Sequence, residues 1–437
     1  MSAGFRARPL WAAGAALALC VWRLRALGDP RLRLAAWYGW FAAAFACYLL
    51  ALWAIRRAEQ QASSSSRLGV LWIIGVAIAA RALLLPTTPA LSDDIYRYRW
   101  DGRVQQAGID PYAYPPSDPR LAFLRDAAYT KINFPQLRTI YPPLTELAFR
   151  AGQAAGGTLM AHKRIMVLAE AITVVCLLLV LRMRQHSLLW IAAYAWHPLA
   201  ILEVAGSGHN DALGIAMLWL GVAAWEARRW AGAAVAFSAA CWAKFASVLL
   251  VPWWWRRGDR RWLAAFAALA AAPFLAHPAT VHALVESLSA MAGRVESNSS
   301  LFALASFALG PTGARLAAIA GGAAWLWWWS ARARDVIQYL LGALAGVALL
   351  SPALHPWYLV WLVPCFCVQR PRALVLLTGT VVFAYAVWPG RLASGAWHLP
   401  AWARALEYAP VMALGALECV RPSSSLLGMK PQPSAAS

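Results

Sequence analysis

The sequence predicts an all-α polytopic membrane protein, and three observations lead to this fold class. Of its 437 residues, 61% are hydrophobic and only 13% are charged, whereas soluble domains are roughly half apolar and a quarter charged. Many apolar runs approach the roughly 20 residues that a spanning helix needs. These runs are continuous and do not alternate with a period of two, which excludes a closed β-barrel.

The apolar runs predict about twelve membrane-spanning helices joined by short polar segments. Basic residues cluster in these joints, for example at Arg56 and Arg57 and at Arg182 and Arg184, and such clusters mark cytoplasmic loops. We therefore interpret the net charge of +20 as an orientation signal, and we expect no nucleic-acid partner. The candidate spans are 9–27, 34–55, 68–85, 165–182, 187–206, 209–227, 230–253, 261–276, 315–330, 335–350, 355–368, 372–388 and 404–420.

Charge also predicts the orientation of the first spans. Arg6 and Arg8 precede an apolar run that lacks a cleavage site, so we expect a retained first span that starts in the cytoplasm. The end of the third span then faces the extracytoplasmic side. This divides the chain into three spans (1–85), an extracytoplasmic loop with interfacial helices (86–164), the remaining spans (165–420) and a Ser- and Pro-rich, disordered cytoplasmic tail (421–437).

The first large loop, 86–142, is the longest polar interruption and holds six of the 19 acidic residues. Long loops in compact proteins are usually functional or disordered. Its many aromatic residues argue against disorder. We therefore expect this loop to carry the function of the protein.

A short juxtamembrane helix is expected near the start of this loop. Ser92 is a suitable N-cap, which puts Asp93 and Asp94 in the first turn, where carboxylates complement the helix dipole. The helix should run to about Gln106 and end at Gly108, since glycine commonly follows the last helical residue.

The two adjacent acids exceed what helix capping requires, so we expect at least one of Asp93 and Asp94 to be catalytic. Asp94, Tyr98 and Asp101 share one helix face at spacings of four and three, which favours Asp94. Asp101 has a plainer alternative, because Arg97 lies four residues before it and can form an ion pair with it.

Two segments have alternative interpretations. The segment 141–157 (YPPLTELAFRAGQAAGG) either crosses the membrane or lies along its surface, and its glycines, Arg150 and the parity of the spans favour the surface. The segment 230–253 is either one span or a hairpin broken around WAKFAS at 242–247.

With this topology, unusual polar residues gather on the extracytoplasmic side. Polar side chains near membrane depth are costly and often mark a cavity or a pathway. Plainer explanations exist, namely a polar turn at 209–211, snorkelling of Lys244 and an aromatic belt around His355. The candidate substrate-binding residues are Tyr98, Asp101, Arg138, Tyr141, His209, Asn210, Asp211, Lys244 and His355.

Six motifs occur in an order that resembles the polytopic glycosyltransferases of the C superfamily. The closest resemblance is to mannosyltransferases that use polyprenyl-phosphate mannose. The motifs run from residue 92 to residue 364 and cover most of the chain. They are SDDIYRYRWDGR, GIDPYAYPP, RTIYPPL, GSGHNDALG, AKFASVLLVP and HPWYLVWLVP.

The resemblance implies a catalytic aspartate in the first large loop, here Asp93 or Asp94, and a lipid-linked donor that enters from the bilayer. It also implies that the phosphate of the donor lies near a basic residue, Lys244 or Arg138. Metal-using relatives have a split Asp-x-Asp, whereas the acidic pair of this chain is contiguous. The spacing of ligands therefore supports no divalent metal, and we assign no cofactor.

The expected chemistry agrees with these residues. A carboxylate can take the proton of an acceptor hydroxyl as it attacks the sugar, and a basic residue can balance the charge of the leaving phosphate. We therefore expect an inverting transferase in the plasma membrane (inner membrane), with a polyprenyl-phosphate sugar donor and a glycan or glycolipid acceptor. The alternative, a transporter or lipid-carrier flippase, predicts internal repeats, and we find none because the large polar loop occurs once.

Overall fold

The computed structural model describes residues 8–60, 67–294 and 296–420, and the expected disordered tail and Arg6 lie outside these ranges. Within them the chain forms helices and no strand, and the one isolated bridge joins Ser297 and Ala353. This confirms the all-α fold class. The α-helices are α2 (Arg8–Ala26), α3 (Leu34–Gln60), α4 (Arg67–Leu84), α5 (Asp94–Gln106), α6 (Pro143–Ala154), α7 (Leu159–Met183), α8 (Ala192–Ala195), α9 (Pro198–Ala200), α10 (Asp211–Glu226), α11 (Trp230–Lys244), α12 (Val251–Arg257), α13 (Arg260–Ala276), α14 (Pro278–Arg294), α15 (Leu301–Arg332), α16 (Val336–Leu350), α17 (Arg372–Thr380), α18 (Val387–Ser394) and α19 (Ala401–Val420).

Short helices of other types connect these elements. Most are 3-10 helices, and one is a π-helix. The 3-10 helices are η1 (Pro30–Leu32), η2 (Pro119–Leu124), η3 (Tyr129–Lys131), η4 (Leu188–Ile191), η6 (Ala246–Leu250), η7 (Pro356–Trp361), η8 (Val363–Cys367) and η9 (Val381–Ala386), and the π-helix is η5 (Ile201–Gly206).

Five helical segments of the described chain are long and apolar enough to cross a membrane, namely α3, α4, α7, α15 and the run Arg372–Ser394. Two bent pairs raise this number to seven if each pair forms one span. Other expected spans coincide with shorter helices, such as α10 with 16 residues and α16 with 15. The chain is therefore a polytopic membrane protein, and the expected number of about twelve spans stays a prediction.

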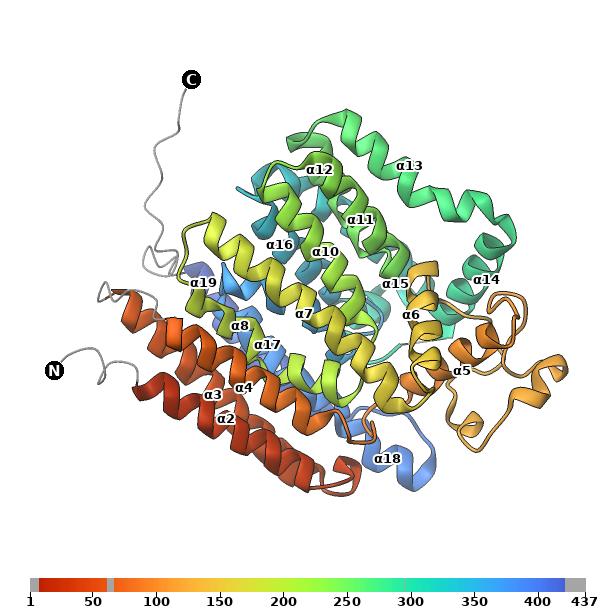
Figure 1. Ribbon diagram of the computed structural model, residues 1–437, viewed down its shortest axis with the longest axis horizontal. Helices are drawn as coiled ribbons and strands as arrows, with labels where there is room; N and C mark the ends of the chain where they lie inside the picture. The colour runs from red at the N-terminus through yellow and green to blue at the C-terminus, as the bar shows by residue number, and fades with distance from the viewer. Residues whose placement is uncertain (1–7, 61–66, 295, 421–437) are drawn as a thin grey trace.

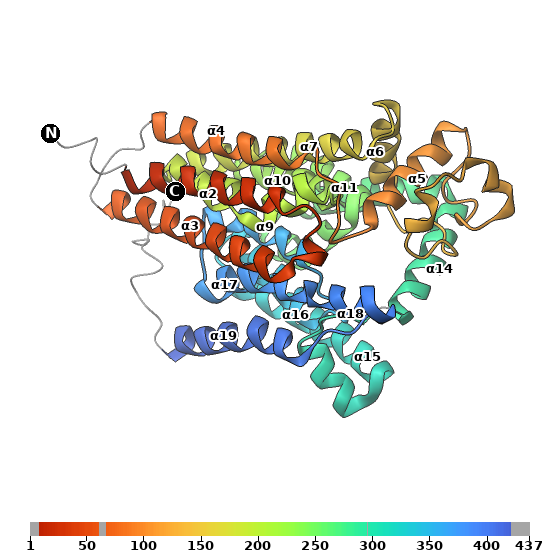
Figure 2. The same cartoon turned by 90° about the horizontal axis from the view of Figure 1, so that it is seen from below.

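The long helices pack side by side, and the polar loop lies at one end of the packed helices. α2 packs against α3 and α4, while α10 packs between α7 and α11. Figures 1 and 2 show α5, α6 and the segment between them at this end, with α14 nearby. The polar loop therefore lies beyond the ends of the packed helices and does not run along their sides.

The expected span 187–206 is broken into η4, α8, α9 and η5, with Pro198 starting α9 after the bend. A buried ion pair supports the break, because Arg81 of α4 contacts Glu170 of α7 at 2.7 Å and also donates to the carbonyl of Ala195 at 2.7 Å. Buried charges persist when they are paired and hydrogen-bonded. Arg81 therefore joins two long helices to the broken one.

Both ambiguous segments now have a defined structure. α6 has only 12 residues, too few to cross a bilayer, which agrees with a helix along the surface. The segment 230–253 is broken, because Phe245 adopts the left-handed region (φ 57°) and ends α11. Some helices start well before the spans expected there: α7 starts at Leu159, six residues before 165, and α15 starts at Leu301, 14 residues before 315.

The juxtamembrane helix α5 ends at Gln106 as expected, but its N-cap is Asp93 and not Ser92. The side chain of Asp93 makes no capping hydrogen bond, while Ser92 Oγ accepts from the amide of Asp94 at 3.3 Å. The side chain of Ser92 therefore caps the helix, although it stands one position before the residue that adopts the N-cap conformation.

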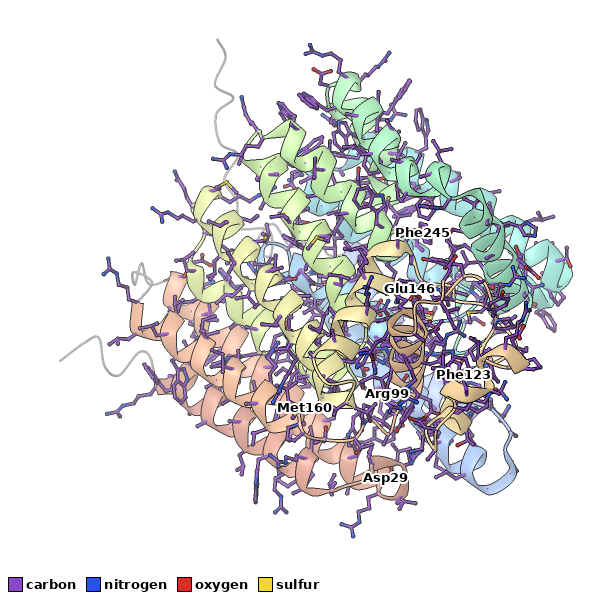
Figure 3. All side chains as sticks on the ribbon, turned by 45° about the vertical axis from the view of Figure 1, so that its right-hand side comes forward. Asp29, Arg99, Phe123, Glu146, Met160 and Phe245 are labelled. Carbon is purple, nitrogen blue, oxygen red and sulfur yellow. The ribbon has the colours of Figure 1, made fainter. Side chains whose placement is uncertain are left out.

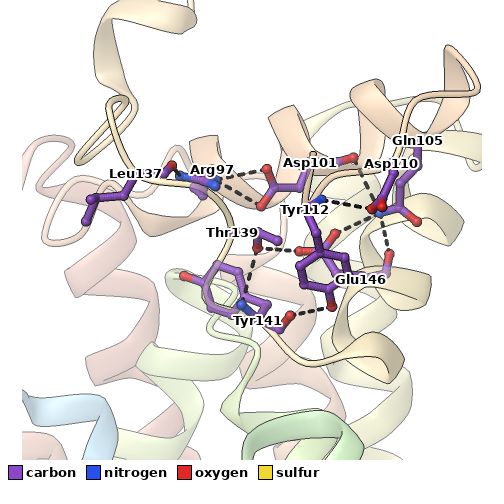
Figure 4. A network of polar contacts seen from close by, with 9 residues as sticks. All are labelled: Arg97, Asp101, Gln105, Asp110, Tyr112, Leu137, Thr139, Tyr141 and Glu146. Carbon is purple, nitrogen blue, oxygen red and sulfur yellow. Dashed lines mark hydrogen bonds and ion pairs between the residues drawn. The ribbon is translucent and has the colours of Figure 1, made fainter. Parts of the chain in front are cut away.

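A buried polar network joins α5 to α6 (Figure 4). Arg97 and Asp101 form an ion pair at 2.9 Å. Glu146 accepts from Thr139 Oγ1 at 2.6 Å and from Gln105 Nε2 at 2.8 Å. The network therefore holds the RTIYPP motif, through its threonine, against the juxtamembrane helix.

Two carboxyl groups of this network, those of Glu146 and Asp101, carry one negative charge between them. Burial raises the pKa of Glu146 well above its ordinary value, and the neighbouring Asp101 raises it further. Burial also raises the pKa of Asp101, although Arg97 opposes the effect. Asp101 therefore remains the charged partner of Arg97, and Glu146 holds the proton.

We expect Glu146→Gln to alter how stability depends on pH. A carboxyl whose pKa is raised by folding stabilises the fold below its unfolded pKa of about 4.3, and this stability is lost as the pH rises. The melting temperature in detergent should fall between pH 5 and pH 8 in the wild type, and less so in Glu146→Gln. The matched control is Glu286→Gln, at an exposed acid, and equal pH dependence in Glu146→Gln and the wild type would contradict the assignment.

Close packing of α5 on α6 requires Gly102, since a Cβ there would overlap the backbone carbonyl of Phe149. Overpacking of this kind costs about 1–3 kcal/mol. We expect Gly102→Ala to lower the melting temperature in detergent. Gly75→Ala in α4 is the matched control, because nothing lies within 4 Å of its new Cβ, and alanine favours helix by about 1 kcal/mol. A Gly102→Ala protein with an unchanged melting temperature would show that α5 and α6 can move apart freely.

Candidate functional site

Asp93 lies in a basic environment at the start of α5. Burial raises the pKa of its carboxyl, and the positive charges of Arg391 and Arg31 oppose this shift. Arg31 follows α2 and also pairs with Asp29 at 2.7 Å, while Arg391 belongs to α18. Cations from two distant parts of the chain thus favour the charge of Asp93, although burial has the larger effect.

Asp94 faces a different set of groups. Its side chain is 27% exposed, and its Oδ2 lies 3.8 Å from His209 Nδ1. Its Oδ1 accepts a long hydrogen bond, 3.4 Å, from Asn133 Nδ2. The two adjacent aspartates therefore have separate surroundings, and Asp94 is the one directed at the GHND motif.

The GHND motif forms the junction between η5 and α10. Gly208 has φ +77°, and a Cβ there would overlap Lys163 and Ile95, so the sharp turn and the close approach of α5 both require glycine. Asn210 then caps α10. The turn directs three consecutive polar side chains, His209, Asn210 and Asp211, into a buried region.

Asn210 and Asp211 connect the loop helix to the end of α11. Asn210 Oδ1 accepts from the hydroxyl of Tyr98 at 3.1 Å and from Lys244 Nζ at 3.3 Å. Asp211 pairs with Lys244 at 2.7 Å and accepts from Trp361 Nε1, also at 2.7 Å. The side chain of Lys244 is 27% exposed, so its ammonium remains accessible beside these partners.

His209 is 2% exposed and lies between two carboxylates. Its Nε2 is 3.3 Å from Glu203 Oε2, on the opposite side of the ring from Asp94. The indole of Trp357 stacks on His209 at 4.1 Å and on His355 at 4.5 Å between ring centroids. His355 is thus connected to this cluster by its stacking on Trp357.

The candidate residues separate into two groups in space. Asp94, Tyr98, His209, Asn210, Asp211 and Lys244 lie together, Tyr141 packs edge-on against Tyr98 at 5.3 Å, and His355 joins through Trp357.

Asp101 and Arg138 are not part of the gathered group. Asp101 is buried against Arg97, which favours the ion-pair alternative over a contact with substrate. Arg138 contacts Glu286 of α14 at 3.6 Å, with both side chains more than one third exposed. Figure 3 shows the same end of the molecule, with Arg99 and Glu146 near its centre and the exposed Phe123 farther out.

Several residues of the cluster carry a weak sequence signal. Glu203 is an isolated acid in an apolar run, six positions before His209, and this was its only distinguishing feature. Trp357 belongs to the HPWYLVWLVP motif. Asn133 and Tyr385, whose hydroxyl donates to Glu203, have no comparable signal, since asparagine is common in loops and aromatic residues are common throughout this chain. Their roles depend on contacts between segments far apart in the sequence.

The cluster combines acids, imidazoles and one lysine, which suits proton transfer and the binding of an anion. Among the described residues, no group of three or more His, Cys, Asp and Glu side chains is arranged to hold a metal ion. Asp94 and Lys244 are the accessible ionisable groups of the cluster, each 27% exposed. A ligand that enters the cluster therefore meets one carboxylate and one ammonium.

Comparison with known proteins assigns the family. A family model described as the N-terminal domain of alpha-(1->6)-mannopyranosyltransferase matches residues 11–256, more than half of the chain. No curated protein and no solved structure matches it. The matched range contains five of the six motifs of the glycosyltransferase resemblance in full, and it confirms that resemblance. The chain belongs to the alpha-(1->6)-mannopyranosyltransferase family and is a polytopic membrane mannosyltransferase.

Proposed function

We propose that this mannosyltransferase takes mannose from a polyprenyl-phosphate donor and transfers it, on the extracytoplasmic side of the plasma membrane, to a glycan or glycolipid acceptor. The observation that carries the proposal is that an accessible carboxylate, Asp94, and an accessible ammonium, Lys244, both lie beside the same buried GHND turn. Transfer from a sugar phosphate needs both groups, because a hydroxyl loses a proton while a phosphate gains charge.

Asp94 is the preferred general base. Its carboxylate lies beside the GHND turn, and its 27% exposure leaves it open to an acceptor hydroxyl. Asp93 has other surroundings, because burial raises the pKa of its carboxyl while the charges of Arg391 and Arg31 oppose this shift. Asp94 is preferred because it is the aspartate directed at the turn that also binds Lys244.

Lys244 is the preferred partner of the donor phosphate. An ammonium has three N–H donors, and within the described part of the chain Asn210 and Asp211 accept two of them. The third can bind a phosphate oxygen. Lys244 is the last residue of α11, and the helix is broken at Phe245 directly after it. A phosphate can therefore approach the lysine at a helix end, where no continuous helical backbone lies in its way.

One base on one face of the sugar gives inversion. The acceptor oxygen forms its bond to the anomeric carbon as the bond to the phosphate oxygen breaks, and the electron pair leaves on the lipid phosphate. The hydroxyl proton passes to Asp94. The mechanism needs no second carboxylate to form a covalent intermediate, in contrast to retaining hydrolases.

Asp94→Asn should abolish transfer, whereas Asp93→Asn should retain a measurable rate. Loss of a general base costs about 10²–10⁴-fold in rate. Transfer of radiolabelled mannose from polyprenyl-phosphate mannose to endogenous acceptors in membranes is the measurement, normalised to the amount of folded protein. The assignment fails if Asp94→Asn is as active as the wild type.

Lys244→Gln should raise the KM for the donor, and Lys244→Arg should restore part of the affinity because it keeps the charge. A charge-assisted hydrogen bond contributes about 1.5–3 kcal/mol, which corresponds to roughly 10- to 100-fold in affinity. Initial rates at varied donor concentration test this. An unchanged donor KM in the glutamine variant would exclude contact between Lys244 and the phosphate.

A further inference from the structure

The imidazole of His209 lies between two carboxylates and is hydrogen-bonded to neither. Its Nδ1 is 3.8 Å from Asp94 Oδ2 and its Nε2 is 3.3 Å from Glu203 Oε2. Both ring nitrogens and Glu203 Oε2 are buried without a hydrogen-bond partner among the described residues. Buried polar atoms without partners are costly and therefore point to a function.

The charge state of the ring decides which of these contacts can form. A neutral imidazole has one N–H and can donate to one carboxylate, whereas an imidazolium has two and can donate to both. The ring also stacks on Trp357 at 4.1 Å, and an indole attracts a cation. The surroundings of His209 therefore become fully satisfied only when the ring gains a proton.

Glu203 is held in place to orient this ring. It is 2% exposed, and its other oxygen accepts from the hydroxyl of Tyr385 at 2.5 Å. It cannot rotate away without leaving a buried hydroxyl unpaired. Its free oxygen therefore stays directed at Nε2 of His209, which keeps the N–H on that nitrogen and leaves Nδ1 as the acceptor toward Asp94.

We propose that His209 removes from Asp94 the proton that this aspartate takes from the acceptor hydroxyl, and that Glu203 is the positioning residue that holds the imidazole for this step. The inference rests on the proposed function of Asp94. The hydroxyl proton first passes to the Asp94 carboxylate as the glycosidic bond forms and lipid phosphate leaves. It then passes to Nδ1, and the imidazolium formed donates Nε2–H to Glu203. Later release of this proton to solvent returns the ring to its neutral state.

The relay explains why the catalytic carboxylate is not paired with a cation at rest. With a neutral ring, Nδ1 presents a lone pair to Asp94, which agrees with their separation of 3.8 Å. Asp94 thus remains a free base until it is protonated. His355 and Tyr358 are further ionisable side chains packed against the same tryptophan, at 4.5 Å and 5.9 Å from Trp357 between ring centroids.

Kinetics of substituted full-length protein in membranes test the relay. His209→Gln should lower kcat by about 10²–10³-fold, as loss of an acid–base group does, with the KM values for donor and acceptor unchanged. Glu203→Gln should lower kcat by about 10- to 100-fold, as expected for a group that orients another. His282→Gln, at an exposed histidine of α14, is the control and should leave kcat unchanged.

Two further measurements separate the relay from a structural role. Imidazole added to His209→Ala should restore kcat at least tenfold, with more rescue as the fraction of imidazole free base grows, and it should restore nothing in Asp94→Asn. The double variant His209→Gln/Glu203→Gln should be no slower than His209→Gln alone, because Glu203 acts only through the ring.

The proposal is overturned by any of three results. These are a kcat of His209→Gln within threefold of the wild type, a loss that imidazole does not restore in His209→Ala, and a raised KM with unchanged kcat, which would make His209 a binding residue. If Asp94→Asn is inactive while His209→Gln is active, the relay alone fails. If Asp94→Asn is active, the proposed function fails as well, so the two failures are distinguishable.

Discussion

The side-chain carbonyl of Asn210 is the contact on which the site depends. It accepts hydrogen bonds from Tyr98 in the loop helix α5 and from Lys244 at the end of α11. Tyr98 is 112 residues and Lys244 is 34 residues from Asn210 in the sequence, so three separate segments meet at one buried oxygen. Together with the ion pair between Asp211 and Lys244 at 2.7 Å, this contact fixes the GHND turn relative to the loop helix and to the lysine.

The surrounding helices are interrupted where polar groups must be accommodated. The run 187–206 is broken before the GHND turn, and 230–253 is broken directly after Lys244. Irregular backbone at membrane depth is tolerated only inside the protein or along a cavity, because its amides and carbonyls need partners. The first run accepts a hydrogen bond at Ala195 from Arg81 of the buried Arg81–Glu170 pair, so this run contacts a structural ion pair and then leads into the site.

The two adjacent aspartates carry the same carboxyl group, but their positions on the helix give them different neighbours. Successive residues at a helix start point in different directions, so Asp93 meets Arg391 and Arg31 while Asp94 meets His209 and Asn133. The charge of Asp93 is opposed by burial and favoured by two cations, whereas the carboxylate of Asp94 is directed at the imidazole of His209. The helix dipole favours both negative charges, and only their neighbours differ.

The fold class and the approximate helix positions follow from the sequence alone, because hydropathy and chain breakers act over a few neighbouring residues. The same locality explains why α5 was expected to end at Gln106 and why Asp93 and Asp94 were singled out. What depended on tertiary structure was pairing across long separations: Asp101 with Glu146, Arg138 with Glu286, and Asp94 with His209. Composition favours burial of apolar residues without specifying which helices touch, so a lone acid such as Glu203 gains its meaning only when the folded chain brings it within 3.3 Å of an imidazole.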